Sequence, residues 1–138
     1  MLFLSFLAFA QIKIENPIPS TDIKVKRCFA NGNGVIVDLI INNYSNKDLQ
    51  LTLYTQLVID DEGISYDYNM CRSIDSNGEE RIGSMGVNIF IPKEGFSRYR
   101  TRISDVSDFA ASLQYLRIAA LGNSKYEIIV RNIPIDRD

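Results

Sequence analysis

The chain has 138 residues and a formal net charge of −2, from 15 lysines and arginines against 17 acidic residues. This length provides one domain with a buried core, and the balance of 46% hydrophobic to 23% charged residues excludes a disordered chain. The slightly acidic balance creates no global positive field, so nucleic acid is not an expected partner.

The first ten residues are apolar, uncharged and end in Ala8-Phe9-Ala10, the small-x-small pattern that signal peptidase cleaves. We therefore predict a signal-peptide hydrophobic region over 1–10, cleaved before Gln11, and one domain over 11–138. The run is shorter than the roughly 20 apolar residues of a membrane span, so no span is expected. The run lacks the basic residues that usually precede such a region, which leaves a buried N-terminal strand as the alternative.

From Ile23 onward, apolar and β-branched runs alternate with clusters of Gly, Asn, Asp and Ser at intervals of roughly 8 to 14 residues. The expected strands are 23–30, 35–42, 49–59, 64–68, 72–74, 87–91, 96–103, 113–121 and 126–133. No strand alternates with a helix-length segment, and 104–112 has room only for one helical turn or a crossing loop. The pattern predicts an all-β, immunoglobulin-like antiparallel β-sandwich of about seven to nine strands.

Two of these strands show the clearest period-2 alternation. In 35–42, Val35, Val37, Leu39 and Ile41 fall on one face, which should be the core face. In 49–59, one face would carry Leu49, Leu51, Leu53, Leu57 and Ile59, with polar residues opposite. This second segment therefore reads as a half-buried strand.

The chain contains two cysteines, Cys28 and Cys71. In an oxidising compartment they could form a disulfide that closes a loop of about 43 residues and adds roughly 4 kcal/mol in the chain-entropy model. The alternative is two small buried thiols. Neither is an expected nucleophile, because the chain contains no histidine to act as a base.

Acidic and aromatic residues gather around one predicted turn. Asp60, Asp61 and Asp67 are a weak calcium candidate, because calcium prefers oxygen ligands. The EF-hand spacing is absent, which favours a solvated hairpin turn. Tyr66 and Tyr68 flank Asp67 and are candidates for a flat aromatic contact to a sugar or peptide, with cross-strand packing as the alternative.

A basic row is the most specific candidate for binding. Arg98, Arg100 and Arg102 share one face of a predicted strand, about 7 Å apart, where they could meet carboxylate or sulfate groups. Pairing with acidic residues on a neighbouring strand, or protection of a sheet edge, would explain the same row. Asn43-Tyr44-Ser45 also matches a glycosylation acceptor, which matters only in a eukaryotic secretory pathway.

A set of segments spread over most of the mature chain forms a recognisable order: 35–38, 42–43, 60–63, 91–96, 103–106, 113–118, 126–128 and 131–134. Together these segments resemble small exported bacterial proteins of unknown function with an immunoglobulin-like fold. The resemblance implies a β-sandwich and a location outside the cytoplasm, secreted or periplasmic in the cell envelope. It implies no catalytic residue.

Without histidine, Ser-His-Asp and Cys-His catalysis is excluded and the commonest zinc ligand is missing. Only a two-carboxylate glycosidase stays open, and every acidic cluster lies in a predicted turn. We therefore predict a non-catalytic extracytoplasmic binding module, without cofactor, whose partner is a protein or glycan of the cell envelope. The alternative is a structural or accessory subunit that assembles by edge-strand pairing.

Overall fold

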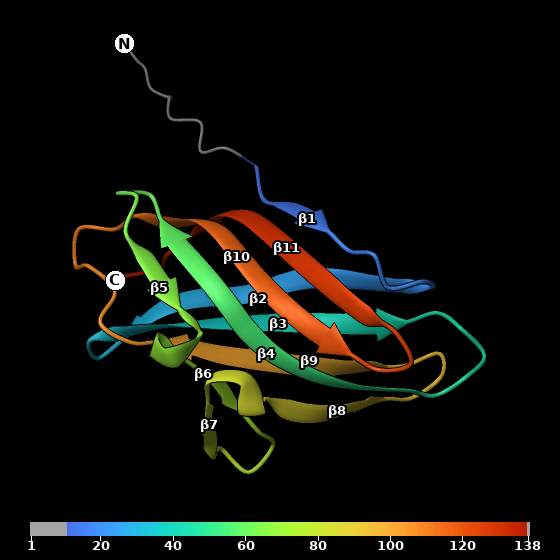
Figure 1. The fold of residues 1–138 in the computed structure, drawn as a ribbon. Helices are drawn as coiled ribbons and strands as arrows, with labels where there is room; N and C mark the ends of the chain where they lie inside the picture. Colours follow the sequence, from blue (N-terminus) through green and yellow to red (C-terminus); the bar gives the residue numbers. More distant parts are fainter. Residues whose placement is uncertain (1–10, 138) are drawn as a thin grey trace.

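The computed structural model describes residues 11–137, so the predicted signal region at 1–10 lies outside the described residues. Within 11–137, two antiparallel sheets face each other (Figure 1). Sheet A has the order β1-β11-β10-β4-β5, with β8 also paired to β4, and sheet B has the order β2-β3-β9-β6-β7. The predicted all-β, immunoglobulin-like antiparallel sandwich is confirmed.

The strands are β1 (Lys13–Glu15), β2 (Thr21–Asn31), β3 (Gly34–Asn43), β4 (Leu49–Asp60), β5 (Ser65–Asp67), β6 (Cys71–Ile74), β7 (Glu80–Ile82), β8 (Val87–Ile91), β9 (Phe96–Ile103), β10 (Ser112–Leu121) and β11 (Lys125–Pro134). Two short 3-10 turns, η2 (Tyr68–Met70) and η3 (Gly83–Met85), interrupt them. No helix within 11–137 is long and apolar enough to cross a membrane.

Every expected strand forms, and two edge strands were missed. β1 and β7 have three residues each, too few to show a period, and they form because a neighbouring strand offers an open edge. Residues 104–111 cross from sheet B to sheet A without helix, which decides between the two alternatives for that segment.

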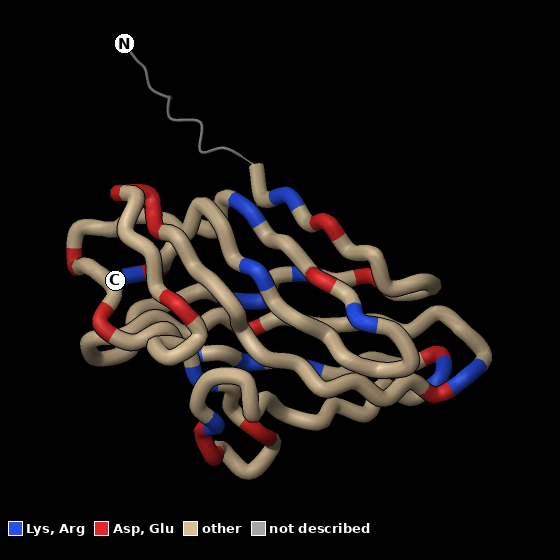
Figure 2. The backbone as a smooth tube through the Cα atoms, in the orientation of Figure 1, with Lys and Arg blue, Asp and Glu red and all other residues tan. Residues whose placement is uncertain are grey.

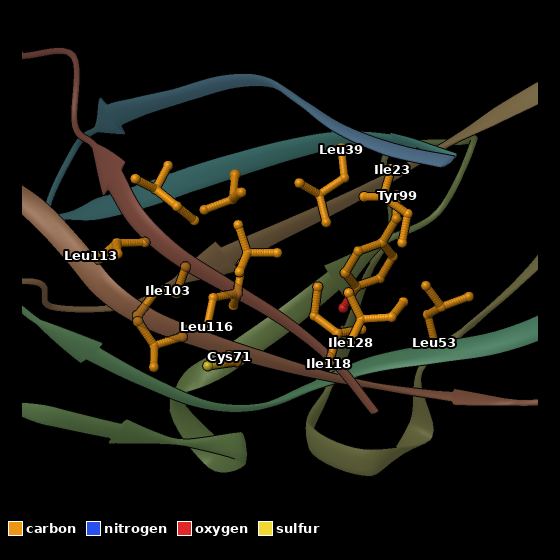
Figure 3. Packing of buried hydrophobic residues seen from close by; sticks show 14 of the residues in the cluster. Ile23, Leu39, Leu53, Cys71, Tyr99, Ile103, Leu113, Leu116, Ile118 and Ile128 are labelled. Atoms are coloured by element: carbon orange, nitrogen blue, oxygen red, sulfur yellow. The ribbon is translucent and has the colours of Figure 1, made fainter. Parts of the chain in front are cut away.

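The core lies between the two sheets and contains the predicted face of β3. Val35, Val37, Leu39 and Ile41 are all fully buried there. Figure 3 shows Leu39 and Tyr99 from sheet B meeting Ile118 and other side chains of sheet A. Burying one such aliphatic side chain stabilises the fold by roughly 1.5–3 kcal/mol.

The alternation predicted for β4 is correct only in its first half. A register shift against β10 falls between Thr55 and Leu57, so Gln56 is an extra residue that forms a β-bulge. The bulge reverses the faces beyond it, and Val58 and Asp60 are buried where Leu57 and Ile59 were expected. A one-residue slip moves every later side chain to the other face, and the apolar pattern alone does not reveal it.

A cluster of hydroxyl groups lies in the core beside this bulge. The Tyr99 hydroxyl is hydrogen-bonded to Thr55 Oγ1 at 2.9 Å and to Ser73 Oγ at 2.8 Å, and Thr55 donates to Thr101 at 2.8 Å. Burial raises the pKa of Tyr99 above its usual value. Because each hydroxyl has partners, the cluster joins the two sheets without leaving these buried groups unsatisfied.

The disulfide predicted between Cys28 and Cys71 is wrong, because both are buried free thiols. Cys28 lies on β2 and Cys71 on β6, at positions separated by β3 and β9 within sheet B. Three strand spacings of about 4.8 Å place the two strands roughly 14 Å apart, whereas a disulfide needs Cα atoms within about 7 Å. The alternative of two buried thiols is therefore the one observed.

Candidate binding face and groove

The three arginines of the predicted row do share one face of β9. The buried residues of β9 alternate with them, so Arg98, Arg100 and Arg102 all lie on the outer face of sheet B. Their roles differ, however. Arg102 donates to the carbonyl oxygen of Asn31 and to the side chain of Asn33, each at 3.2 Å, and so fastens the β2–β3 turn.

Arg98 and Arg100 converge on one carboxylate from the neighbouring strand. Asp38 of β3 lies opposite Arg100, and its Oδ2 accepts a hydrogen bond from Arg100 Nη2 at 3.0 Å. Its Oδ1 forms an ion-pair contact with Arg98 Nε at 3.5 Å and has no hydrogen-bond partner. Asp38 is only 1% exposed although it lies on the outer face, so the sequence alternative of cross-strand pairing is correct for Arg98 and Arg100.

More cations lie on this outer face than the row alone. We define the basic face as the outer face of sheet B carrying Lys24, Lys26, Arg27, Arg72, Arg98, Arg100 and Arg102; the bulge residue Lys26 lies beside Arg27. The acidic residues in the same register rows are Asp22, Asp38, Glu80 and Asp136, the last of which is bridged to Phe29. Figure 2 shows the blue segments along β2 and β9, behind sheet A. The surface charge is therefore uneven, although the whole chain is slightly acidic.

A groove of about 600 Å³ opens at one end of the basic face, between β8 and β9. Arg98, Arg100 and Ser97 form one wall and residues of β8 the other, with Val87 and Ile89 buried and Phe90 exposed. The β6–β7 loop closes one side through Asp75, Ser76 and Gly78. The groove therefore combines apolar surface with two guanidinium groups, the mixture typical of a ligand site.

Only half of β9 is paired on the side that faces the groove. Its other side pairs with β3 along the whole strand, from Phe96 to Ile103. On the groove side, β6 pairs only with Arg100–Ile103 and ends at Ile74. The backbone of 96–99 therefore faces the groove without a neighbouring strand among residues 11–137.

The two candidate tyrosines do not form a joint aromatic contact. Tyr66 is only 2% exposed, donates its hydroxyl proton to Asp60 Oδ2 at 2.8 Å and accepts from the Ser107 N–H at 3.1 Å. Its pKa is raised by burial first and, to a smaller extent, by Asp60. Tyr68 is exposed and is the first residue of η2. It therefore lies outside β5, the strand that contains Tyr66. The prediction of a shared binding surface is wrong for Tyr66, which has a structural role.

The acidic residues of the calcium candidate bind their own backbone in separate places. Asp60 is fully buried, and its Oδ1 accepts from the N–H groups of Glu62 and Ile64. Asp61 accepts from the Ala111 N–H, and Asp67 from the Asn69 N–H. No group of three or more acidic or cysteine side chains within 11–137 could hold a metal ion. The alternative of a solvated turn fits Asp61 and Asp67. Asp60 is instead buried, and its carboxylate holds the 60–64 turn through hydrogen bonds.

The glycosylation match at Asn43 is also structural. Asn43 is buried, and its Nδ2 donates to the carbonyl oxygens of Lys47 and Ile91 at 2.9 and 3.1 Å. Its Oδ1 accepts from the backbone and hydroxyl of Ser45. Because the whole amide is used inside the fold, it is not available for modification.

Sequence reasoning missed two parts of the site, Asp38 and the groove. The signal for Asp38 was present, because an acid between the core residues Val37 and Leu39 must point to the face opposite the core. The groove had no signal, because it depends on where β6 ends relative to β9.

Comparison with known proteins does not place the chain in a family. No family model matches it, and no curated protein matches it. The similar solved structures include a family 123 glycoside hydrolase from Clostridium perfringens, with 12% identity over 71% of this chain and a TM-score of 0.44. The chain spans 20% of that hydrolase.

Two further solved structures match over nearly the whole chain. Northeast Structural Genomics Consortium target SoR45 has 11% identity, covers 91% of this chain and 86% of its own, and has a TM-score of 0.46. The seventh PapD-like domain of human CEP192 has 9% identity, covers 99% and 96%, and has a TM-score of 0.41. Likenesses this distant carry no argument about function, and the resemblance to small exported bacterial proteins stays a prediction.

Proposed function

We propose that this protein is a non-catalytic binding module that works outside the cytoplasm and holds an anionic partner, a protein or a glycan, on its basic face. The observation that carries the proposal is the collection of cations on the outer face of one sheet in a chain that is acidic overall. Lysine and arginine collected on one face attract anions, and arginine adds paired hydrogen bonds to carboxylate or sulfate groups.

The location and the absence of catalysis rest on the sequence. An export signal at 1–10 would bring the domain to the envelope, and the lack of histidine removes the usual catalytic bases. On the basic face, Arg98 and Arg100 form ion pairs with Asp38, and Arg72 forms one with Glu80. Guanidinium groups of this kind are suited to holding an anion rather than to moving protons.

The test uses a sulfated polymer, dextran sulfate, with uncharged dextran as the control ligand. Replacing Lys24, Lys26 and Arg27 with glutamine removes three cations of β2, all exposed on the basic face. The matched variant replaces Lys47, Lys93 and Lys125, which are exposed in loops and a hairpin elsewhere and change the net charge equally.

We expect the first variant to weaken dextran sulfate binding about tenfold at low salt, with a shallower dependence on salt, and the matched variant to change it less than twofold. Equal losses in the two variants would mean that net charge alone drives binding, and the basic face would then not be the site.

One observation favours a second function, that of a structural subunit joined by strand pairing. Half of β9 has an unpaired edge, and unpaired edges are templates for another strand. Sedimentation that shows a strict monomer at high protein concentration would exclude self-assembly through this edge.

A further inference from the structure

The backbone groups of β9 alternate between its two neighbours. The Asn43 N–H donates to the Gly95 carbonyl at 2.8 Å, and the Ser104 N–H donates to the Met70 carbonyl at 2.9 Å. Since successive residues of a strand point their N–H and C=O to opposite sides, odd-numbered residues of β9 face β3 and even-numbered residues face β6. The N–H and C=O groups of Phe96 and Arg98 therefore point into the groove.

The next strand ends before it reaches these groups. Beyond Ile74 the chain turns away, because the Asp75 N–H donates to the Glu79 carbonyl and the Gly78 N–H to the Asp75 carbonyl. The position beside 96–99 in sheet B is thus a vacant half-strand, and the groove occupies it.

The guanidinium groups beside this vacancy are incompletely paired. Arg98 and Arg100 share the single carboxylate of Asp38, and the buried Nε of Arg100 has no hydrogen-bond partner. Their side chains are 50% and 32% exposed, so an incoming group can reach them.

Asp75, the acidic residue in the β6–β7 loop that closes one side of the groove, already has its own hydrogen-bond partners. The Asp75 carboxylate accepts from the backbone N–H groups of Glu79 and Asn77 and contacts Arg81 at 3.4 Å. The first of these hydrogen bonds is the main reason that its pKa is lowered. The charge left for a ligand in the groove is therefore positive.

We infer that the groove binds an extended segment of another polypeptide, added as a strand beside Phe96–Tyr99, with acidic side chains at every second position. This rests on the proposed binding function and narrows its partner to a peptide. A glycan has no regularly spaced N–H and C=O groups to pair with β9, whereas an added strand satisfies them.

The two faces of sheet B set the pattern of the segment. Side chains of an added strand alternate between the outer face, beside Arg98 and Arg100, and the inner face, toward Val87 and Ile89. Acidic residues therefore suit the first set of positions and apolar residues the second.

A second copy of this chain fits the vacancy poorly. Symmetrical antiparallel pairing of two β9 edges would bring the arginines of both copies onto one strip of the joined sheet, where like charges repel. Charge complementarity therefore favours a different, acidic partner.

The test uses a blocked heptapeptide of alternating valine and aspartate, with a valine–lysine peptide as the control. We expect only the acidic peptide to bind, and the amide protons of Phe96 and Arg98 to exchange at least tenfold more slowly when it is bound. Arg98→Gln should weaken this binding about tenfold. Lys125→Gln, with the same loss of charge in the β10–β11 hairpin, should leave it unchanged.

Two N-methylated peptides test the backbone pairing without changing the protein. If the added strand is antiparallel to β9, as β6 is, methylation of the aspartate nitrogens abolishes binding and methylation of the valine nitrogens does not. A parallel strand reverses this outcome, and either result supports strand addition.

Three results would overturn the inference while leaving the basic face intact. The first is that the protein binds the two methylated peptides equally. The second is that the acidic peptide changes the NMR chemical shifts of amide groups in β2 alone. The third is that the protein binds dextran sulfate but not the acidic peptide. Protection of the Arg98 amide that grows with protein concentration alone would identify a second copy as the occupant, which also overturns it. Loss of both ligands would remove the proposed function as well.

Discussion

The two buried thiols make the protein sensitive to alkaline pH. Burial raises the pKa of Cys28 and of Cys71 from 9.0 to about 12 in the folded chain. The unfolded chain therefore loses these protons first as the pH rises. Because each thiol has a higher pKa in the folded chain than in the unfolded chain, its protonation contributes to the free energy of unfolding. This contribution is complete below pH 9 and is lost as the pH rises toward 12.

The size of the effect follows from the shift. At pH 10.5 each unfolded thiol lies about 1.5 units above its pKa, which favours unfolding by about 2 kcal/mol, while the folded thiols stay protonated. Two thiols together remove about 4 kcal/mol, a large part of the 5–15 kcal/mol that a typical domain has. Tyr66 and Tyr99, whose pKa values are also raised, add to the loss in the same direction.

The assay is urea unfolding at pH 8.0 and 10.5 for the native chain and for the double variant Cys28→Ala/Cys71→Ala. The native chain should lose about 4 kcal/mol more than the variant between these pH values, since both retain the tyrosines. Denatured native protein should also titrate two thiols without a reducing agent. Equal losses in the two proteins, or no titratable thiol, would refute the reasoning.

Three substitutions test other buried contacts. Asp60→Ala removes the acceptor of hydrogen bonds from Glu62, Ile64 and Tyr66, and we expect a loss of about 3 kcal/mol in urea unfolding; a loss under 1 kcal/mol would contradict this. Tyr99→Phe should cost about 1–2 kcal/mol in calorimetry, and an unchanged melting temperature would argue against the hydroxyl cluster. Asp38→Asn should cost about 2 kcal/mol and tighten dextran sulfate binding at least twofold, because it removes the negative charge between two arginines; weaker binding would count against the basic face.

The strand pattern was readable because burial on one face imposes a period of two. The expected strands from 23 to 133 form within one or two residues of their predicted ends, and the turn at 60–63 forms with Gly63 at a positive φ. Where a β-bulge adds an extra residue, as at Gln56, the buried and exposed faces change places beyond it. The sequence does not say which neighbouring strand sets the register of β4. The β-bulge at Gln56 is therefore visible only in the pairing of β4 with β10.

In the candidate site, too, local spacing could be predicted from the sequence, whereas contacts with distant segments could not. Arg98, Arg100 and Arg102 could be assigned to one face, because their spacing alone determines it. Their different partners could not be assigned, since Asp38 and the 31–34 turn reach them from other parts of the chain. Tyr66 was predicted to be exposed for binding but is buried. Its hydrogen-bond partners, Asp60 and Ser107, come from other segments of the chain.

By itself the amino-acid sequence determined the all-β class, the positions of every strand except β1 and β7, and the lack of histidine-based chemistry. Local periodicity and composition are properties of the chain alone. The tertiary structure decided the separation of Cys28 and Cys71, the basic face and the groove. These depend on which strands become neighbours and where each one ends. Such contacts between distant segments have no signature in the local order of residues.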